Sequence, residues 1–337
     1  MGHLKATGML LCLLMAAAGI SCKHRTADNR YEGLDSALVQ LYRQLEKHPK
    51  NADIHMRIAD YYRLHMQADS ALTHTLTAIR LDSNNAAYYV KLSDIYLILK
   101  DFDNCEEVLE KAIRIDKDYQ EAYLNLAYLH FLFRRYDEAT EVINRCLTLG
   151  DYNPKAYLIQ GWIFRERGDT ASAIRSYMKA VEQDAQYFEA YEELAHLYHV
   201  RHLPLAVEHY KNALKIRPDD ILTRYNLAMF YQETMDNERA MEQYREILQR
   251  EPDNRLALYN LGWIHLCRLG NYDEAVRYFT KVIEQDTSCV EAVYYRGIAF
   301  ECKEDWRSAR QDFAYTLHLD PTYEPSIEAL NRLDSIQ

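Results

Sequence analysis

Histidines are the first candidates for chemistry in this sequence, because His196, His199 and His202 recur at three-residue spacing. Residues three apart lie on one face of a helix, so His196 and His199 could share a metal ion. No cysteine or carboxylate is placed to complete the site, although Glu192 and Glu193 lie one turn earlier. We therefore predict neither a metal nor another cofactor. The alternative role for these histidines is a pH-sensitive patch.

The sequence lacks the motifs of nucleophilic and phosphate chemistry. No serine stands in a Gly-x-Ser-x-Gly elbow, and there is no glycine-rich phosphate loop. Carboxylates are abundant, but they fall in turns and on polar helix faces, where a solvated charge is the ordinary outcome. These absences predict that the protein is not an enzyme and that it binds other molecules.

The elements that would position a binding site are units of about 34 residues that repeat along the chain. One small residue marks each unit, at Ala37, Ala71, Cys105, Ala139, Ala173, Ala206, Ala240, Ala275 and Ala309. A second small residue precedes all but the first of these, at Ala59, Ser93, Ala127, Gly161, Ala195, Ala228, Gly262 and Gly297. Small side chains let two helices cross closely, and apolar residues at helical spacing surround both series. The pattern predicts pairs of helices.

A unit of this length with two small marks resembles the tetratricopeptide repeat, and the segment from Asn260 to Asp286 is nearly that family's consensus. The resemblance covers about residues 34–335. It implies an all-α fold, a right-handed superhelical solenoid of antiparallel helix pairs. Full units begin near Ala52, Ala86, Gln120, Pro154, Phe188, Ile221, Arg255 and Val290.

The resemblance also divides the chain. Residues 34–51 match a lone second helix, residues 52–323 hold eight full repeats, and residues 324–337 form a capping helix. Three side chains depart from the family pattern: Gln160 and Arg296 stand where Leu is usual, and Arg224 fills an aromatic place. A 33-residue unit containing Pro204 departs in length. We expect these departures to alter local packing and to leave the fold unchanged.

In the resembling family the first helix of each pair lines a concave groove. Its groove-facing places are the second, fifth, sixth, ninth, twelfth and thirteenth of each unit. Here these places are charged in the first two units, at Asp53, Arg57, Asp60, Arg63, Lys91 and Asp94. In later units they are aromatic and rich in amides. The predicted peptide-binding residues are Asn125, Tyr128, Trp162, Tyr225, Asn226, Tyr259, Asn260, Trp263 and Tyr294.

Asparagine is the most informative residue of this set, because it is a mediocre helix former and yet recurs at the sixth place as Asn125, Asn226 and Asn260. Its amide offers donors and an acceptor that match the C=O and N–H of an extended peptide, and flanking aromatic rings offer stacking area. The alternative is that Asn is simply consensus at this place and that Trp162 and Trp263 pack between neighbouring first helices. The family's carboxylate clamps add cations beside such asparagines. Here the nearest groove cation to Asn125 is Lys91 or Lys155, and Tyr225 and Tyr259 replace the cations beside Asn226 and Asn260, so we expect no such clamp.

The first 21 residues have the pattern of a signal peptide, with an apolar run of about fifteen residues that is too short to span a bilayer. Small residues before Cys22 resemble the bacterial lipoprotein signal, although Gly19 stands where that family prefers a branched residue. The resemblance implies cleavage before Cys22 and diacylation of its sulfur, for example with palmitate. Residues 22–33 would then form a flexible tether. An ordinary cleaved signal and an uncleaved anchor remain the alternatives.

Net charge and cysteine placement argue against two features, a nucleic-acid partner and a structural disulfide. The net charge of −11 without a basic stripe argues against nucleic acid. Among the later cysteines, Cys105 and Cys146 replace small core residues. Cys267 and Cys302 occupy one place in adjacent repeats, which separates them by about 10 Å, beyond disulfide reach. We expect no structural disulfide.

The sequence leaves three functional hypotheses open. In the first, the protein is a lipid-anchored scaffold of the bacterial cell envelope, facing the periplasm, that holds an extended partner segment in its groove between Asn226 and Tyr295. The partner would belong to an envelope assembly or secretion complex. In the second, the protein is a structural subunit that docks through its convex or end surfaces. In the third, the aromatic groove captures a glycan or another soluble ligand.

Overall fold

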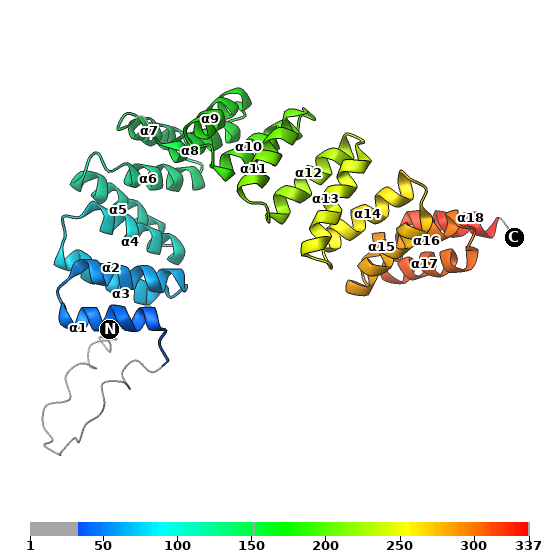
Figure 1. Cartoon of the computed structure of the whole chain (residues 1–337), viewed down its shortest axis with the longest axis horizontal. Coiled ribbons are helices and arrows are strands. Elements are labelled where there is room, and N and C mark those ends of the chain that lie inside the picture. The colour runs from blue at the N-terminus through cyan, green and yellow to red at the C-terminus, as the bar shows by residue number, and fades with distance from the viewer. Residues whose placement is uncertain (1–32, 151, 336–337) are drawn as a thin grey trace, which may run out of the picture. The chain divides into compact units, whose positions relative to one another are not determined.

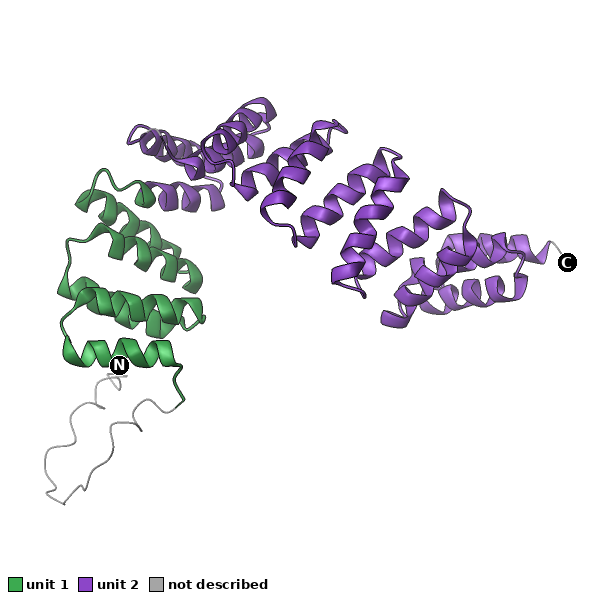
Figure 2. Cartoon of the chain, viewed as in Figure 1, with its two compact units in different colours: residues 1–122 green, residues 123–337 purple. Residues whose placement is uncertain are grey.

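The computed structural model describes residues 33–150 and 152–335, and helices are the only regular elements in these ranges (Figure 1). The predicted signal peptide, Cys22 and most of the predicted tether lie outside them. The chain divides into two compact units, residues 1–122 and residues 123–337 (Figure 2). The division falls inside α6 (Gln120–Leu132).

Unit 1 holds one single helix, two helix pairs and the first turn of α6. The single helix is α1 (Ser36–Lys47), and the pairs are α2 (Ala52–Leu64) with α3 (Ala68–Leu81) and α4 (Ala86–Leu99) with α5 (Phe102–Ile115). Leu38 and Leu41 of α1 pack with Ile54 and Ile58 of α2 in one buried cluster. The lone helix is therefore held on the first pair by an apolar face.

Unit 2 continues the same alternation of first and second helices and ends on a single helix, α18 (Glu324–Asp334) (Figure 1). Its first helices after α6 are α8 (Pro154–Glu166), α10 (Phe188–His199), α12 (Ile221–Glu233), α14 (Arg255–Cys267) and α16 (Val290–Cys302). Its second helices are α7 (Tyr136–Leu147), α9 (Thr170–Gln183), α11 (Leu205–Ile216), α13 (Asn237–Arg250), α15 (Tyr272–Gln285) and α17 (Trp306–Leu319). The prediction of an all-α array of helix pairs is confirmed.

Asparagine and aspartate side chains cap many of these helices. Asn51 Oδ1 accepts the backbone N–H of Ile54 at 3.1 Å, and Asn153 Oδ1 accepts that of Ala156 at 3.0 Å. A cap of this kind contributes about 1 kcal/mol. The caps therefore help to fix the residue at which each helix begins.

Glycines on the first helices stand where a second helix crosses closely. A Cβ atom at Gly161 would overlap the ring of Tyr177, and one at Gly297 would lie 2.7 Å from Cε1 of Phe313. Both rings are fully buried. The prediction that small residues mark close helix crossings is therefore confirmed at these places.

None of the helices in the described ranges is both long enough and apolar enough to cross a bilayer.

Candidate functional site

The candidate binding surface of unit 2 is the side of its first helices that carries the second, fifth, sixth, ninth, twelfth and thirteenth residues of each repeat, here called the first-helix face. The predicted peptide-binding residues lie on α6, α8, α12, α14 and α16, and all of them are half-buried except Asn260, which is buried. Side chains on this face therefore pack partly on each other and leave part of their surface to a ligand.

Asn260 differs from the sequence-based expectation. Its side-chain Nδ2 donates to the Tyr225 hydroxyl and to the Leu256 carbonyl, both at 3.1 Å, and the residue is 8% exposed. Both amide hydrogens are thus used inside the protein. The reason is that the Tyr225 side chain of α12 reaches across to Asn260 of α14. This asparagine ties two first helices together and does not present its donors to a ligand.

Asn226 is the amide that remains available. It is half-buried, and its side chain forms no hydrogen bond with any residue in the described ranges. Its neighbour in the sequence, Tyr225, is already engaged by Asn260. Asn125, by contrast, already has an interaction partner in the structure. Of the three asparagines, Asn226 is therefore the one with both a donor and an acceptor to offer.

Aromatic rings line the first-helix face on α14 and α16. The Tyr259 and Tyr295 rings meet edge to face with centroids 6.2 Å apart, and Tyr294 lies 5.3 Å from Tyr295. Burial raises the pKa of Tyr259, and it also raises that of Tyr294. Their phenols therefore stay neutral at physiological pH and can still donate hydrogen bonds. Rings of this kind suit apolar or planar ligand groups.

Trp162 packs between neighbouring first helices. Its ring centroid lies 5.9 Å from Phe131 and 6.1 Å from Tyr128 of α6, and its Nε1 donates to Glu193 Oε1 of α10 at 2.5 Å. Arg165 forms an ion pair with the same carboxylate. These contacts agree with the packing interpretation of Trp162. Trp263 is partly buried against the core cluster of unit 2, and the Arg268 guanidinium lies 5.0 Å from its ring centroid in a cation–π contact.

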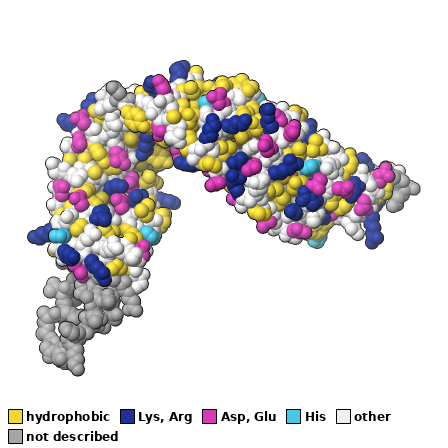
Figure 3. Space-filling view, viewed as in Figure 1, with side chains coloured by type: hydrophobic (Ala, Val, Ile, Leu, Met, Phe, Trp, Pro, Cys, Tyr) yellow, Lys and Arg dark blue, Asp and Glu magenta, His cyan; other side chains and the backbone are white. Residues whose placement is uncertain are grey.

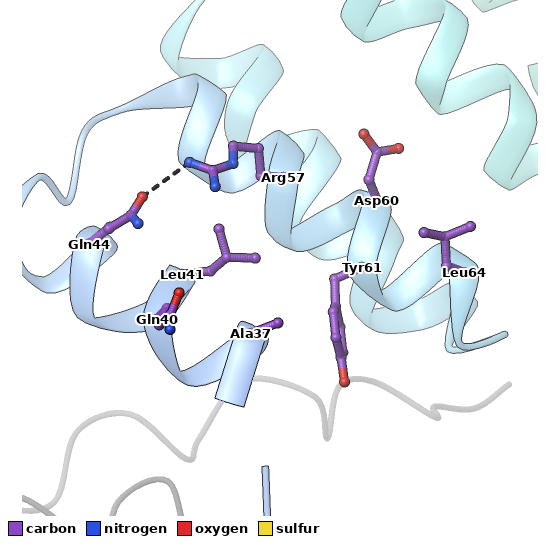
Figure 4. Close-up of a pocket in the computed structure, with 8 residues that line it drawn as sticks. All are labelled: Ala37, Gln40, Leu41, Gln44, Arg57, Asp60, Tyr61 and Leu64. Carbon is purple, nitrogen blue, oxygen red and sulfur yellow. Dashed lines mark hydrogen bonds between the residues drawn. The ribbon is translucent and has the colours of Figure 1, made fainter. Parts of the chain in front are cut away.

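Charged groups on the visible surface are mixed in sign (Figure 3). In unit 1, Asp60 lies 3.5 Å from Arg63 and 3.4 Å from Lys91, so the predicted charged places pair with each other. Beside them a pocket of about 360 Å³ opens between α1 and α2 (Figure 4). It is lined by Ala37, Gln40, Leu41, Gln44, Arg57, Asp60, Tyr61 and Leu64.

The histidines considered for metal binding serve other contacts. His199 Nδ1 lies 2.9 Å from the Tyr210 hydroxyl, and His199 Nε2 lies 3.1 Å from Glu233 Oε2. His196 is exposed. The described residues contain no group of three or more His, Cys, Asp and Glu side chains able to hold a metal ion. His199 therefore joins α10 to α11 and α12 through hydrogen bonds.

A different histidine pair escaped the sequence analysis. Nδ1 of His55 lies 3.0 Å from Nδ1 of His74, and Nε2 of His74 lies 3.3 Å from the Tyr42 hydroxyl. Burial and the neighbouring His55 lower the pKa of His74 to about 4. The signal in the sequence was the coincidence of two histidines at facing places of one helix pair, α2 and α3.

The cysteines in the described ranges are free thiols. Cys105 and Cys146 are buried, and burial raises the pKa of each thiol to about 11. Both thiols therefore stay protonated and unreactive. The Cys105 thiol donates to the carbonyl of Ser93 at 3.4 Å, across the crossing of α4 and α5.

Comparison with known proteins agrees with this architecture. Models described as TPR repeat or tetratricopeptide repeat match residues 161–200, 86–119 and 120–149, and 225–275 and 266–324. Together these matches cover more than half of the chain. No curated protein matches the chain.

Among solved structures, the C-terminal part of a TPR repeat-containing protein from Cytophaga hutchinsonii is similar, with a TM-score of 0.62 and 20% identity over 72% of this chain and 99% of that one. YrrB, described as a TPR protein with an unusual peptide-binding site, shares 19% identity over 55% of this chain and 96% of its own, with a TM-score of 0.43. MamA shares 25% identity over 48% of this chain and 95% of its own, with a TM-score of 0.41. The repeat models, the small residues at each helix crossing and the alternating helices lead to one conclusion: the chain belongs to the tetratricopeptide repeat family.

Proposed function

We propose that this protein is a non-enzymatic interaction scaffold that binds an extended segment of a partner protein on the first-helix face of unit 2. Membership of the tetratricopeptide repeat family supports a protein partner, since the first helices of that family line a ligand groove. The described residues offer hydrogen-bonding and stacking groups on this face. The proposal places function in binding, with no chemical step.

The availability of Asn226 is the observation that carries the proposal. A half-buried amide with no hydrogen-bond partner among the described residues can donate to a peptide carbonyl and accept from a peptide N–H at once. Each such bond contributes about 1 kcal/mol net, so one asparagine sets register more than affinity. Tyr259, Trp263 and Tyr294 then supply the stacking area for the ligand's side chains.

The same proposal includes the cell envelope as the site of action. Its support is the sequence before the described residues, in which an apolar run precedes Ser21 and Cys22 and is followed by a polar stretch. A diacylated Cys22 would hold the array at a membrane, with a short tether before α1. We place the array on the periplasmic side because no acidic run follows Cys22.

Site-specific photocrosslinking in living cells tests this proposal. A benzophenone amino acid replaces Tyr259 on α14 in one variant and Lys211 on the second helix α11 in a matched control. We expect Tyr259 to capture a defined protein, with the crosslink in one continuous segment, and Lys211 to capture none of it. Capture of that protein only from Lys211 would instead favour docking through the convex surface, and capture of a glycan from Tyr259 would favour a soluble ligand.

A further inference from the structure

We propose that a second copy of this chain completes the repeat whose two halves lie at the ends of the described array. In this arrangement α18 of one copy serves as the first helix for α1 of the next copy. The inference concerns the ends of the array and does not depend on the partner segment proposed for the first-helix face.

The first observation is that α1 has the pattern of a second helix and that no first helix precedes it in the described residues. Its small mark, Ala37, is exposed. The equivalent residues of the other units are at most 3% exposed: Ala71, Cys105, Ala139, Ala173, Ala206, Ala240, Ala275 and Ala309. In those units the first helix covers the small residue, as the contact between the Cys105 thiol and the Ser93 carbonyl shows. Ala37 therefore marks an uncovered crossing site.

The sequence before α1 does not carry the pattern of the missing helix. In the unit that begins at Ala86, the fourth, seventh, eighth and eleventh places hold Tyr89, Leu92, Ser93 and Tyr96. One period before the first full unit, the same places fall on Ser21, His24, Arg25 and Asp28. These residue types are polar or charged, so the sequence does not carry the apolar pattern of a first helix at these places. A helix from another copy would supply that apolar pattern.

The second observation is that α18 is a first helix without a second helix. It begins one period after α16 and packs on α17 through Ala329 and Leu333, both buried. Ile327, however, is 40% exposed and Leu330 is only half-buried. The residues at their places on α14, Leu258 and Leu261, are 1% and 0% exposed. No second helix follows α18 in the part of the chain that the structure describes.

The pocket between α1 and α2 lies where the missing first helix of α1 would pack. The pocket between α1 and α2 has a volume of about 360 Å³, and Ala37, Leu41 and Leu64 form its apolar part (Figure 4). In unit 2 the eighth place of a first helix faces the ring of its second helix, as Gly297 faces Phe313. At the junction Asn331 would face Leu41 instead. Leu41 is smaller than the Phe313 ring, and Asn331 is larger than Gly297. The smaller side chain on α1 therefore leaves room for the larger one on α18.

Charge also fits this arrangement. Within unit 2 the fifth residue of one first helix meets the sixth residue of the next, because Tyr225 accepts a hydrogen bond from Asn260. The same relationship would bring Glu328 of one copy to Arg57 of the next. Arg57 Nη1 donates to the Gln44 amide oxygen at 3.1 Å on the rim of the pocket, and no carboxylate of the described residues pairs with it (Figure 4). A carboxylate there would form a charge-assisted pair with the guanidinium.

The contact uses two different surfaces, so a pair of joined copies still has one free α1 end and one free α18 end. Such a heterologous contact builds an open chain of copies, or a ring where the rotation between copies closes. The scaffold would then present its first-helix face as a repeated surface.

Crosslinking between engineered cysteines in the full-length protein in cells tests the proposal. The exposed or half-buried thiols are first removed with Cys267→Ser, Cys289→Ser and Cys302→Ser. Ala37→Cys and Asn331→Cys are then combined, and a short bismaleimide is added. We expect a ladder of bands at multiples of the chain mass, since each junction joins one copy to the next.

The matched control pairs Asn331→Cys with Asn84→Cys, an exposed position outside the pocket. We expect the ladder to fall at least tenfold in this control and in either single-cysteine variant. A product at the mass of one chain, a band shared with a different protein, or no product at all would overturn the proposal. So would an equal ladder from the control pair.

Two further variants separate a specific junction from chance collision. Ile327→Arg, at an exposed position that the fold of one copy does not need, should remove most of the ladder. Glu328→Arg should weaken it, and adding Arg57→Glu to Glu328→Arg should restore it. A ladder that persists with Ile327→Arg, or a double exchange that fails to restore it, contradicts the arrangement.

Discussion

Arg296 on α16 and Asp312 on α17 form a two-bond ion pair, with Nε to Oδ2 at 2.8 Å and Nη2 to Oδ1 at 2.7 Å. The Asp312 side chain is 9% exposed and that of Arg296 is 21% exposed. Arg296 stands where the repeat usually has leucine, so the helix pair replaces an apolar contact with a matched polar one. Gln160 and Ser176 repeat the relationship between α8 and α9, with Ser176 Oγ donating to Gln160 Oε1 at 3.0 Å.

Removing one member of the ion pair should lower the free energy of unfolding far more than replacing both members with apolar residues. Asp312→Ala leaves the Arg296 guanidinium largely buried without its carboxylate, and we expect a loss of about 3 kcal/mol in the free energy of unfolding of this helix pair. Arg296→Leu with Asp312→Val restores the residue types of Leu92 and Val108 in an earlier unit, and should be close to wild type. Hydrogen exchange of the α16 and α17 amides measures the stability of the single variant and of the double variant. Equal destabilisation by the single and double variants would contradict this account.

The pair of His55 and His74 should make the first helix pair sensitive to acid. The pKa of His74 is lowered to about 4, against 6.5 in an unfolded chain, so the unfolded state binds more protons between these values. The contribution of neutral His74 to the free energy of unfolding is therefore fully present above about pH 6.5. It is lost as the pH drops toward 4. Between pH 7 and pH 5 we expect a loss of about 1 kcal/mol in unit 1, allowing for partial solvent screening.

Hydrogen exchange of α2 and α3 at pH 7 and pH 5 measures this dependence. His74→Phe keeps an aromatic ring without a titrating group, and we expect it to reduce the difference between the two pH values. His48→Gln changes an exposed histidine and should leave the difference unaltered. The same pH dependence in wild type and His74→Phe would show that another group is responsible.

Glycine-to-alanine substitutions should form a graded series. Alanine favours a helix by about 1 kcal/mol over glycine, while overpacking a core costs about 1–3 kcal/mol. At Gly161 the added Cβ overlaps the buried Tyr177 ring, whereas at Gly262 it lies 3.1 Å from Phe279. We expect Gly161→Ala to lower stability by about 2 kcal/mol and Gly262→Ala to change it little. Thermal unfolding followed by circular dichroism ranks them, and the reverse order would argue against the close crossing at Gly161.

Cys22 should carry a lipid in cells. The wild-type chain grown with labelled palmitate should incorporate the label and sediment with membranes. Cys22→Ser should lose the label, while Cys12→Ser, within the apolar run, should keep it. A wild-type chain without label would leave the ordinary cleaved signal or the uncleaved anchor as the explanation.

The sequence predicted the helix pairs because their determinants are local. Small residues at one period, caps such as Asn153 and turn residues such as Gly168 act within a few residues, and each leaves a mark at a fixed place. The same period predicted a single helix at each end of the repeat array. The sequence alone did not show that Ala37 and Ile327 are exposed, and the inference about the two ends depends on that exposure.

The candidate site was less predictable because it depends on side-chain partners from different repeats. Asn226 and Asn260 occupy the same place in their units, yet only Asn260 has the Tyr225 phenol within reach. Likewise, Trp162 is engaged by Glu193, which lies a full repeat away. A single sequence does not record which of two candidate partners a side chain reaches.

The central claim is that the first-helix face around Asn226 binds an extended partner segment. Its most direct test is the affinity of the full-length protein for a synthetic peptide of the segment captured from Tyr259, measured beside Asn226→Ala and Asn212→Ala. Asn212 lies on the second helix α11 and serves as the matched control. We predict that Asn226→Ala weakens binding about tenfold, as expected for two lost hydrogen bonds, and that Asn212→Ala leaves it unchanged. Equal affinity for all three proteins would contradict the account.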